Sequence, residues 1–306
     1  MGRELVKQLA AEGCHVATCD VSAENLAVTK VESARTAPPG TRVSTHLCDV
    51  SDERQVLGFR DAVREEHATD HVHLLFNNAG IAGGGSLFSD DRSEWERTFA
   101  VDWWGVYYCT RAFLPLLVAS PEARLVNTSS VNGFWASVGP GVPHTAYSAA
   151  KFAVKGFTEA LIIDLRVNAP HVQASLVMPG HVGTSIVINT AAVHGRPSPK
   201  EMTEQDLATL RERLKLPPGV PSDDQLRALV QQVGDDFRDK APLSAAGAAT
   251  IILDGVRRGA WRILVGDDAV ELDRMVRATP EEAYEDSFMA KLRAKGIFAA
   301  IRPPGS

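Results

Sequence analysis

The chain has 306 residues, 44% hydrophobic and 23% charged, which suits one large α/β domain of an ordinary globular protein. Its formal net charge of -6 argues against nucleic acid as the main partner, because phosphate binding needs a basic surface. No apolar run approaches the ~20 residues that cross a bilayer, so we expect no membrane partner.

Cysteine and histidine usage indicates neither disulfides nor metal ligands. The cysteines are scattered, without a C-x-x-C pair: Cys14, Cys19, Cys48 and Cys109. We interpret them as reduced, mostly buried thiols, and the first residues form an amphipathic pattern without the apolar core of a secretion signal. We therefore expect a cytoplasmic location. The histidines show no metal spacing, since His71 and His73 alone supply too few ligands, and no metal is expected.

Apolar strand-like runs alternate with amphipathic helical stretches along the chain. Strands are expected at 14–19, 43–48, 72–77, 124–129, 172–178 and 261–265. Helices are expected near 2–12, 23–34, 52–67, 93–119, 146–168, 203–214, 223–238, 244–258 and 280–295. Strands separated by helices predict βαβ units and an α/β fold with a doubly wound, Rossmann-like parallel sheet covered on both faces.

Residues 183–242 break this rhythm with several prolines and two charged helical patterns. Because they directly follow a strand end, where ligands bind in open α/β sheets, we expect an insertion that covers the active site. The alternative is a surface excursion without a functional role. We expect a single domain over 1–306, with a helical C-terminal extension from about 267.

The sequence Y-S-A-A-K at 147–151 places Tyr147 and Lys151 four residues apart on one helix face. An unperturbed tyrosine, with a pKa of about 10, exchanges protons poorly at neutral pH, and a nearby lysine cation lowers that pKa. The pair can then act as a general acid or base on an alcohol or carbonyl. The alternative is an ordinary pair on a helix surface.

Two strand ends upstream strengthen this interpretation. Ser129 and Ser130 end one strand, where a hydroxyl can donate a hydrogen bond to a substrate oxygen as charge develops. The sequence N-N-A-G at 77–80 ends another, and its small residues allow close approach of a ligand to the backbone. A loop cap and an ordinary turn are the alternatives.

With P-G-H-V-G-T at 179–184, these motifs resemble the single-domain branch of the short-chain dehydrogenase/reductase (SDR) family, over residues 1 to about 190 and again near 244–266. The resemblance implies that Tyr147 is the catalytic acid/base and that Lys151 tunes it and binds the nicotinamide ribose. Ser130 would polarise the substrate carbonyl, with Ser129 as the alternative. The implied cofactor-binding residues also include Gly2, Asp49, Asn78, Ala79, Gly80, Pro179, Gly180, Val182 and Thr184.

Asp20 ends the second strand of the family pattern, in V-A-T-C-D. A carboxylate there accepts hydrogen bonds from the adenosine ribose and repels a 2′-phosphate, and no arginine or lysine follows it closely. We therefore expect NAD(H) rather than NADP(H). The alternative is an aspartate that only caps the next helix.

Three features depart from the family pattern. The family begins with a strand and a T-G-x-x-x-G-x-G turn that holds the pyrophosphate. This chain starts inside the turn and retains only Gly2, so we expect the first strand to be missing and hypothesise that the native protein is longer. Asp102 stands where the family has a catalytic asparagine, and we keep it as a catalytic candidate. Ser130 and Tyr147 are seventeen residues apart, with extra residues in a Gly/Pro-rich loop, where Trp135 and His144 either line the pocket or pack the loop.

We expect an NAD-dependent oxidoreductase that interconverts a secondary alcohol and a ketone, with an apolar small-molecule substrate. Two alternatives remain: a non-catalytic binding or regulatory protein on the same fold, and an extended-branch epimerase or dehydratase. The resemblance also implies a homodimer or homotetramer formed through the long helices at about 93–119 and 146–168.

Overall fold

The computed structural model describes residues 1–139, 142–214, 216–217 and 219–297. Four parallel strands form its main sheet in the order β3-β4-β5-β8: β3 (Leu74–Asn77), β4 (Ala123–Thr128), β5 (Val172–Pro179) and β8 (Arg262–Val265). A second parallel piece pairs β1 (Val16–Asp20) with β2 (Val43–Leu47), and a short third pairs β6 (Val182–Gly183) with β7 (Leu243–Ser244). All six predicted strands are present within two residues of their expected ends.

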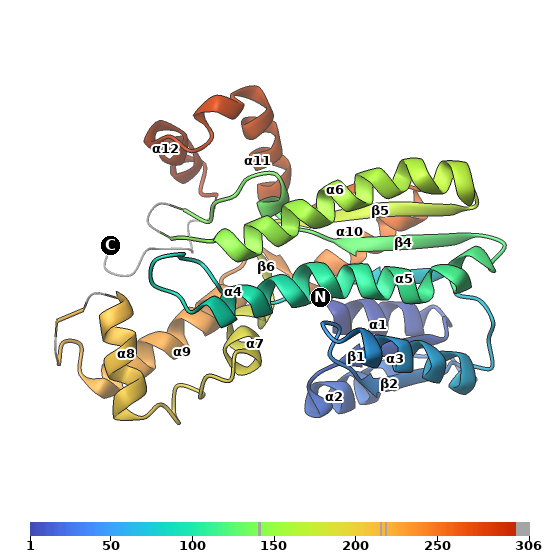
Figure 1. The fold of residues 1–306 in the computed structure, drawn as a ribbon, viewed down its shortest axis with the longest axis horizontal. Helices are drawn as coiled ribbons and strands as arrows, with labels where there is room; N and C mark the ends of the chain where they lie inside the picture. Colours follow the sequence, from blue (N-terminus) through green and yellow to red (C-terminus); the bar gives the residue numbers. More distant parts are fainter. Residues whose placement is uncertain (140–141, 215, 218, 298–306) are drawn as a thin grey trace.

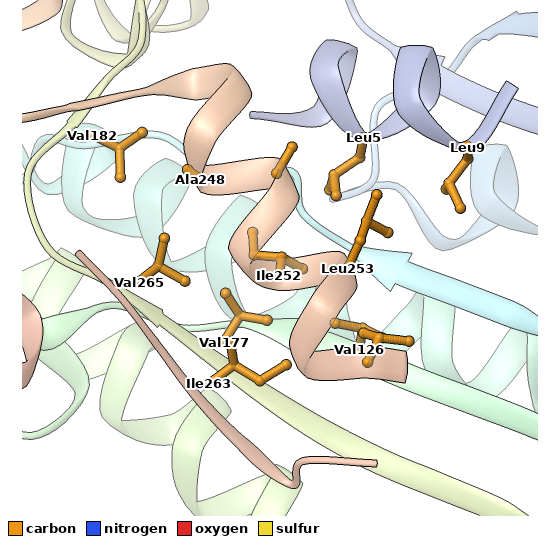
Figure 2. Close-up of a cluster of buried hydrophobic side chains, with 12 residues drawn as sticks. Leu5, Leu9, Val126, Val177, Val182, Ala248, Ile252, Leu253, Ile263 and Val265 are labelled. Carbon is orange, nitrogen blue, oxygen red and sulfur yellow. The ribbon is translucent and has the colours of Figure 1, made fainter. Parts of the chain in front are cut away.

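Alternate residues of the main sheet point to opposite faces and give each face its own core. On one face Val126 of β4 and Val177 of β5 pack against α1 (Gly2–Ala11) and α10 (Ala245–Arg257), as Figure 2 shows. On the other face Leu125 and Leu176, their chain neighbours, pack toward α5 (Gly105–Val118) and α6 (Thr145–Asn168). Helices thus cover both faces, and the predicted doubly wound α/β fold is confirmed.

The sheet has a discontinuity between β1 and β3, which share no strand pairing in the described residues. Side-chain packing joins the two pieces instead. Cys19 of β1 and Leu75 of β3 both contact a cluster built on Val56 of α3 (Glu53–Glu66) and Phe113 of α5. In Figure 1, β1 and β2 lie together with α1, α3 and α2 (Ala23–Ala34) beside the four-stranded sheet.

A buried polar network ties the sheet to the long helices. Asn77 of β3 donates to Asn127 of β4 (2.8 Å) and to Thr110 of α5 (3.0 Å), and Asn127 donates to Thr158 of α6 (3.0 Å). Because these groups lie away from water, each bond avoids the free-energy penalty of an unpaired polar group. The network fixes α6, which carries Tyr147 and Lys151, relative to the strand ends.

The expected helix at 93–119 is interrupted. It consists of α4 (Arg92–Phe99), a π-helical turn (Ala100–Trp104) and α5. Pi-helical turns are rare and often occur at functional sites, and this one carries Asp102.

The region 183–242 contains α7 (Ile186–Val193), α8 (Glu204–Leu214) and α9 (Asp223–Asp239), which project to one side in Figure 1. The C-terminal part contains α11 (Asp267–Ala278), a 3-10 turn (Pro280–Glu282) and α12 (Asp286–Ala294). The predicted helix at 280–295 was therefore too long, and residues 298–306 of the expected extension lie outside the described residues. Within the described chain, no helix has the length and apolar character needed to cross a membrane.

Candidate active site

The first turn of α6 is held against a run of three glycines, residues 83–85. The backbone amides of Thr145 and Ala146 donate to the carbonyl oxygens of Gly85 (3.0 Å) and Gly84 (3.1 Å). Gly84 has a φ of +60°, and a Cβ there would lie 2.9 Å from the Cβ of Ala146. Only glycine suits this contact, so the glycine run fixes the position of Tyr147 at the start of α6.

Lys151 lies one turn beyond Tyr147, at the carboxyl end of β4. Its side chain is 3% exposed, and its Nζ donates to the carbonyl oxygen of Thr128 at 3.4 Å. The same Nζ lies 5.2 Å from the centre of the Tyr147 ring. The structure therefore brings the predicted pair together with a buried cation beside the phenol.

Burial dominates the protonation of Tyr147 and raises its pKa. The Lys151 cation and a hydrogen bond with the Ser130 side chain act in the opposite direction, whereas the Asp102 carboxylate raises the pKa further. The lysine thus has the predicted effect on the tyrosine, but desolvation outweighs it. At neutral pH the phenol holds its proton.

The two serines at the end of β4 have different partners. The Ser129 hydroxyl donates to the backbone oxygen of Lys151 at 2.7 Å and so anchors α6 to the sheet. The Ser130 hydroxyl accepts from the backbone amide of Asn132 (3.1 Å) and hydrogen-bonds with the Tyr147 side chain. Only the Ser130 hydroxyl is thus placed beside the tyrosine, which favours it over Ser129 as the substrate-facing serine.

Asp102 is fully buried on the π-helical turn. Its Oδ1 accepts from the backbone amide of Ile81 at 2.8 Å, and its Oδ2 faces Lys151 Nζ at 3.6 Å without a hydrogen-bond donor in the described chain. Burial raises the pKa of this carboxyl to about 6, although Lys151 opposes the shift. A Cβ on Gly80 would lie 3.1 Å from Asp102 Oδ1 and 3.2 Å from Lys151 Nζ, so the absence of a side chain at Gly80 leaves space beside this pair.

Asn78 stands at the meeting point of β3 and the start of α1. A Cβ on Gly2 would lie 2.8 Å from Asn78 Nδ2, and Asn78 Oδ1 is buried without a hydrogen-bond partner among the described residues. Ala79, next in the chain, is exposed. An orphaned amide oxygen beside a helix N-terminus fits the ribose-phosphate part of a dinucleotide.

Asp20, the last residue of β1, and Asp49, just after β2, differ in whether their carboxylates are free to bind a ligand. Asp20 is exposed and accepts from the backbone amide of Ser22 at 2.9 Å, while Ser22, not Asp20, caps α2. The Asp49 carboxylate accepts from Arg97 of α4 (2.7 Å) and from both the amide and hydroxyl of Ser51. The carboxylate of Asp20 is therefore exposed to solvent and can accept further hydrogen bonds, whereas the carboxylate of Asp49 is already bound by Arg97 and Ser51.

The segment 179–184 links β5 to the region that carries α7. Pro179 is buried, and the Gly180 amide donates to the carbonyl oxygen of Val265 at 3.0 Å. Val182 is 5% exposed and packs into the core in Figure 2, so only its backbone can reach a ligand. Thr184 is half-buried.

Trp135 and His144, which were expected either to line the pocket or to pack the loop, have different surroundings. Trp135 is 1% exposed, and its Nε1 donates to the carbonyl oxygen of Ala283 at 2.8 Å, which fastens the loop to the C-terminal helices. His144 instead lies beside Tyr147, with 4.8 Å between ring centres. Trp135 therefore packs the loop, while His144 borders the site; residues 140–141 of this loop lie outside the described residues.

Thr190 of α7 and His194, directly after this helix, hold Ala82 beside the site, and the motifs did not indicate these contacts. The backbone amide of Ala82 donates to the Thr190 hydroxyl (2.8 Å), and the carbonyl oxygen of Ala82 hydrogen-bonds with His194 Nε2 (3.2 Å). Ala82 directly follows Ile81, the donor to Asp102. In the sequence, the glycine run at 83–85 was the available signal for close packing here. In the described residues, no cluster of three or more His, Cys, Asp or Glu side chains can hold a metal ion.

Comparison with known proteins agrees with this geometry. The family profile described as short chain dehydrogenase matches residues 1–194. A Mycobacterium tuberculosis protein named "Putative oxidoreductase SadH" is 33% identical over 279 residues, which cover 90% of this chain and 86% of that protein.

Two solved structures contain nicotinamide cofactors. A short-chain dehydrogenase/reductase from Burkholderia phymatum in complex with NAD has a TM-score of 0.70 and 28% identity, over 92% of this chain and 90% of that one. A metagenomic short-chain oxidoreductase in complex with NADP has a TM-score of 0.51 and 28% identity, over 58% of this chain and 76% of that one.

Proposed function

Because the chain belongs to the short-chain dehydrogenase/reductase family of NAD(P)-dependent oxidoreductases, we propose that it interconverts a secondary alcohol and a ketone with NAD(H) as preferred cofactor. The observation that carries the proposal is the placement of Tyr147 between the Ser130 hydroxyl and the Lys151 cation at the carboxyl end of the sheet. Ligands bind at this edge in open α/β folds.

The proton chemistry follows from that placement. Tyr147 is protonated at neutral pH, so its hydroxyl can donate to a carbonyl oxygen as the ketone is reduced. Ser130 donates a hydrogen bond to the same oxygen and stabilises developing charge. Lys151 then stabilises the phenolate that remains, and in alcohol oxidation the steps run in reverse. A bound nicotinamide supplies or accepts the hydride at carbon.

The residues around Lys151 suit that cofactor. Gly80 leaves room beside Lys151 Nζ, and the orphaned Asn78 Oδ1 offers an acceptor near Gly2. Ala79, Pro179, Gly180, Val182 and Thr184 would line the same cleft, and Asp49 would lie near the adenine. Relatives of known structure contain NAD or NADP, and the free carboxylate of Asp20 favours NAD(H) because it repels a 2′-phosphate.

The region 183–242 is proposed to cover the substrate within a single domain. Its α7 is fastened to Ala82 beside the site, and the half-buried side chains of Ile186 and Val187 suit a substrate with an apolar body.

A second copy of the chain is the proposed partner of α5 and α6. On α6, Phe152, Ile163 and Val167 are 42%, 59% and 74% exposed, and they share one outward stripe by helical spacing. Trp104, directly before α5, is 41% exposed and stacks on Tyr108, so it adds a further exposed apolar side chain. Exposed apolar surface of this kind favours association into a homodimer or homotetramer.

A cofactor titration followed by a turnover assay tests the proposal. NADH binding, followed by tryptophan fluorescence, should saturate, and a panel of secondary alcohols should reduce NAD. A protein that binds neither NADH nor NADPH would contradict the proposal and favour a binding or regulatory role. Binding without turnover of any alcohol or ketone would contradict the proposed reaction.

A further inference from the structure

His144 is the last residue before α6 and a neighbour of the proposed acid/base. Its ring centre lies 4.8 Å from that of Tyr147, with 42° between the ring planes. The side chain does not cap the helix. An imidazole at this place adds a polar group beside the ring of Tyr147.

The backbone around His144 is held from both sides. Thr145, which follows it, donates to Gly85, and the Trp95 indole donates to the Thr145 hydroxyl at 3.2 Å. A Cβ on Gly85 would lie 2.3 Å from the carbonyl oxygen of Pro143. The backbone on the other side of His144 therefore also packs tightly on the glycine run. The backbone that carries the imidazole is therefore held in place before a substrate binds, as specific recognition requires.

The imidazole is neutral and free to bind. Burial lowers the pKa of His144 to about 4, so at neutral pH the ring has one N–H donor and one acceptor nitrogen. Neither nitrogen has a hydrogen-bond partner in the part of the chain that the structure describes. A half-buried polar group without a protein partner gains from a ligand that supplies one.

We propose that His144 is a specificity residue whose imidazole hydrogen-bonds a second oxygen of the substrate, on the carbon next to the reacting one. The preferred substrates are then α-hydroxy ketones and the vicinal diols that correspond to them. This inference rests on the proposed function, because a substrate oxygen at Tyr147 brings the substituents of the neighbouring carbon close to His144. An apolar body remains compatible with it.

Neither Trp135 nor the backbone amide of Ala136 can supply this contact. The indole of Trp135 is turned into the core and donates to Ala283. The backbone N–H of Ala136 already donates to the Tyr284 hydroxyl at 3.1 Å. These two contacts fasten the loop to the C-terminal helices. His144 is thus the polar side chain that this loop places next to Tyr147 in the described residues.

The test compares two probes on the protein saturated with NADH. Calorimetry measures the Kd of trans-cyclohexane-1,2-diol and of cyclohexanol, which differ by one hydroxyl. We expect the diol to bind at least tenfold more tightly, a difference of about 1.4 kcal/mol. His144→Phe keeps the ring packing but removes both nitrogens, and it should abolish this preference without changing the Kd of NADH.

Two further variants complete the design. His144→Gln, whose amide retains a donor and an acceptor, should keep a measurable preference for the diol. His73→Phe, at an exposed histidine directly before β3 and so at the opposite end of that strand from the site, should behave as the wild type. Equal binding of the probes to the wild type, or a preference that survives His144→Phe, would overturn the inference. Neither result affects the proposed function, which fails separately if NADH does not bind.

Discussion

The carboxylate of Asp102 and the ammonium group of Lys151 lie 3.6 Å apart, and both side chains are almost completely buried. Lys151 is the cation that lowers the pKa of Tyr147. A negative charge on Asp102 raises this pKa directly, and it also weakens the electrostatic effect of Lys151 on the phenol. Because burial raises the pKa of Asp102 to about 6, this carboxyl changes its charge within the range of ordinary assays.

Asp102→Asn should move the pH profile of alcohol oxidation toward lower pH. Above about pH 6 the ionised Asp102 raises the pKa of Tyr147. Removing its charge lowers that pKa, so the phenolate forms at a lower pH. Below about pH 6 Asp102 is protonated, and the two profiles should converge. The measurement is kcat/KM between pH 5 and 10, because its pH dependence reports the pKa values of the essential acid and base. Superimposable profiles would remove Asp102 from the mechanism; Asp61→Asn, at an exposed aspartate, is the control.

Gly133→Ala should weaken both stability and activity. The new Cβ would lie 2.3 Å from Ser129 Oγ and 2.8 Å from the backbone oxygen of Lys151, so α6 must shift. We expect a loss of about 1–3 kcal/mol in the free energy of unfolding, as for other overpacked sites. Urea unfolding measures it. Gly58→Ala, with nothing within 4 Å of its Cβ, is the matched control and should be neutral or slightly stabilising. Equal stability of the two variants would contradict the packing argument.

Asp20→Ala should reduce the preference for NAD(H). The variant loses acceptors for ribose hydroxyls and the charge that repels a 2′-phosphate, so kcat/KM should fall with NAD and rise with NADP. A tenfold change in their ratio corresponds to about 1.4 kcal/mol. Glu24→Gln, at an exposed carboxylate in the first turn of α2, controls for general charge effects and should leave the ratio unchanged. A wild-type preference for NADP(H) would refute the assignment.

Ile163→Glu should shift the protein toward the monomer. A carboxylate in the outward stripe of α6 must be desolvated if a second copy covers that surface. Light scattering after size-exclusion chromatography measures the mass at a fixed concentration. Val31→Glu, at a 56% exposed valine on α2, should leave the assembly intact. A monomeric wild-type protein would contradict the proposed assembly.

The strands were predictable because parallel strands buried on both faces leave short apolar runs, such as 176–178 in β5. The helix at 93–119 was predicted as continuous because its polarity pattern does not change at Asp102. The π-helical turn there accompanies contacts with Ile81 and Lys151, which are distant in sequence. Helix α7 was missed because eight mostly apolar residues show no clear helical face.

The site was predictable where a motif fixes the spacing of residues along one element, as with Tyr147 and Lys151 on α6. It was not predictable where neighbouring residues of one type differ only in tertiary contacts. Ser129 and Ser130 are adjacent, yet only the former bonds to the backbone of Lys151. The partner of Asp49, Arg97, lies on another element, and no local pattern indicates it.

The most direct test of the central claim is Tyr147→Phe, assayed for turnover and for NADH binding in the same preparation. Removing the hydroxyl deletes the proton donor but keeps the ring beside His144 and Lys151. We expect kcat to fall by about 10²–10⁴-fold, the usual contribution of a general acid or base, with the Kd of NADH unchanged. Turnover at the wild-type rate would contradict the account.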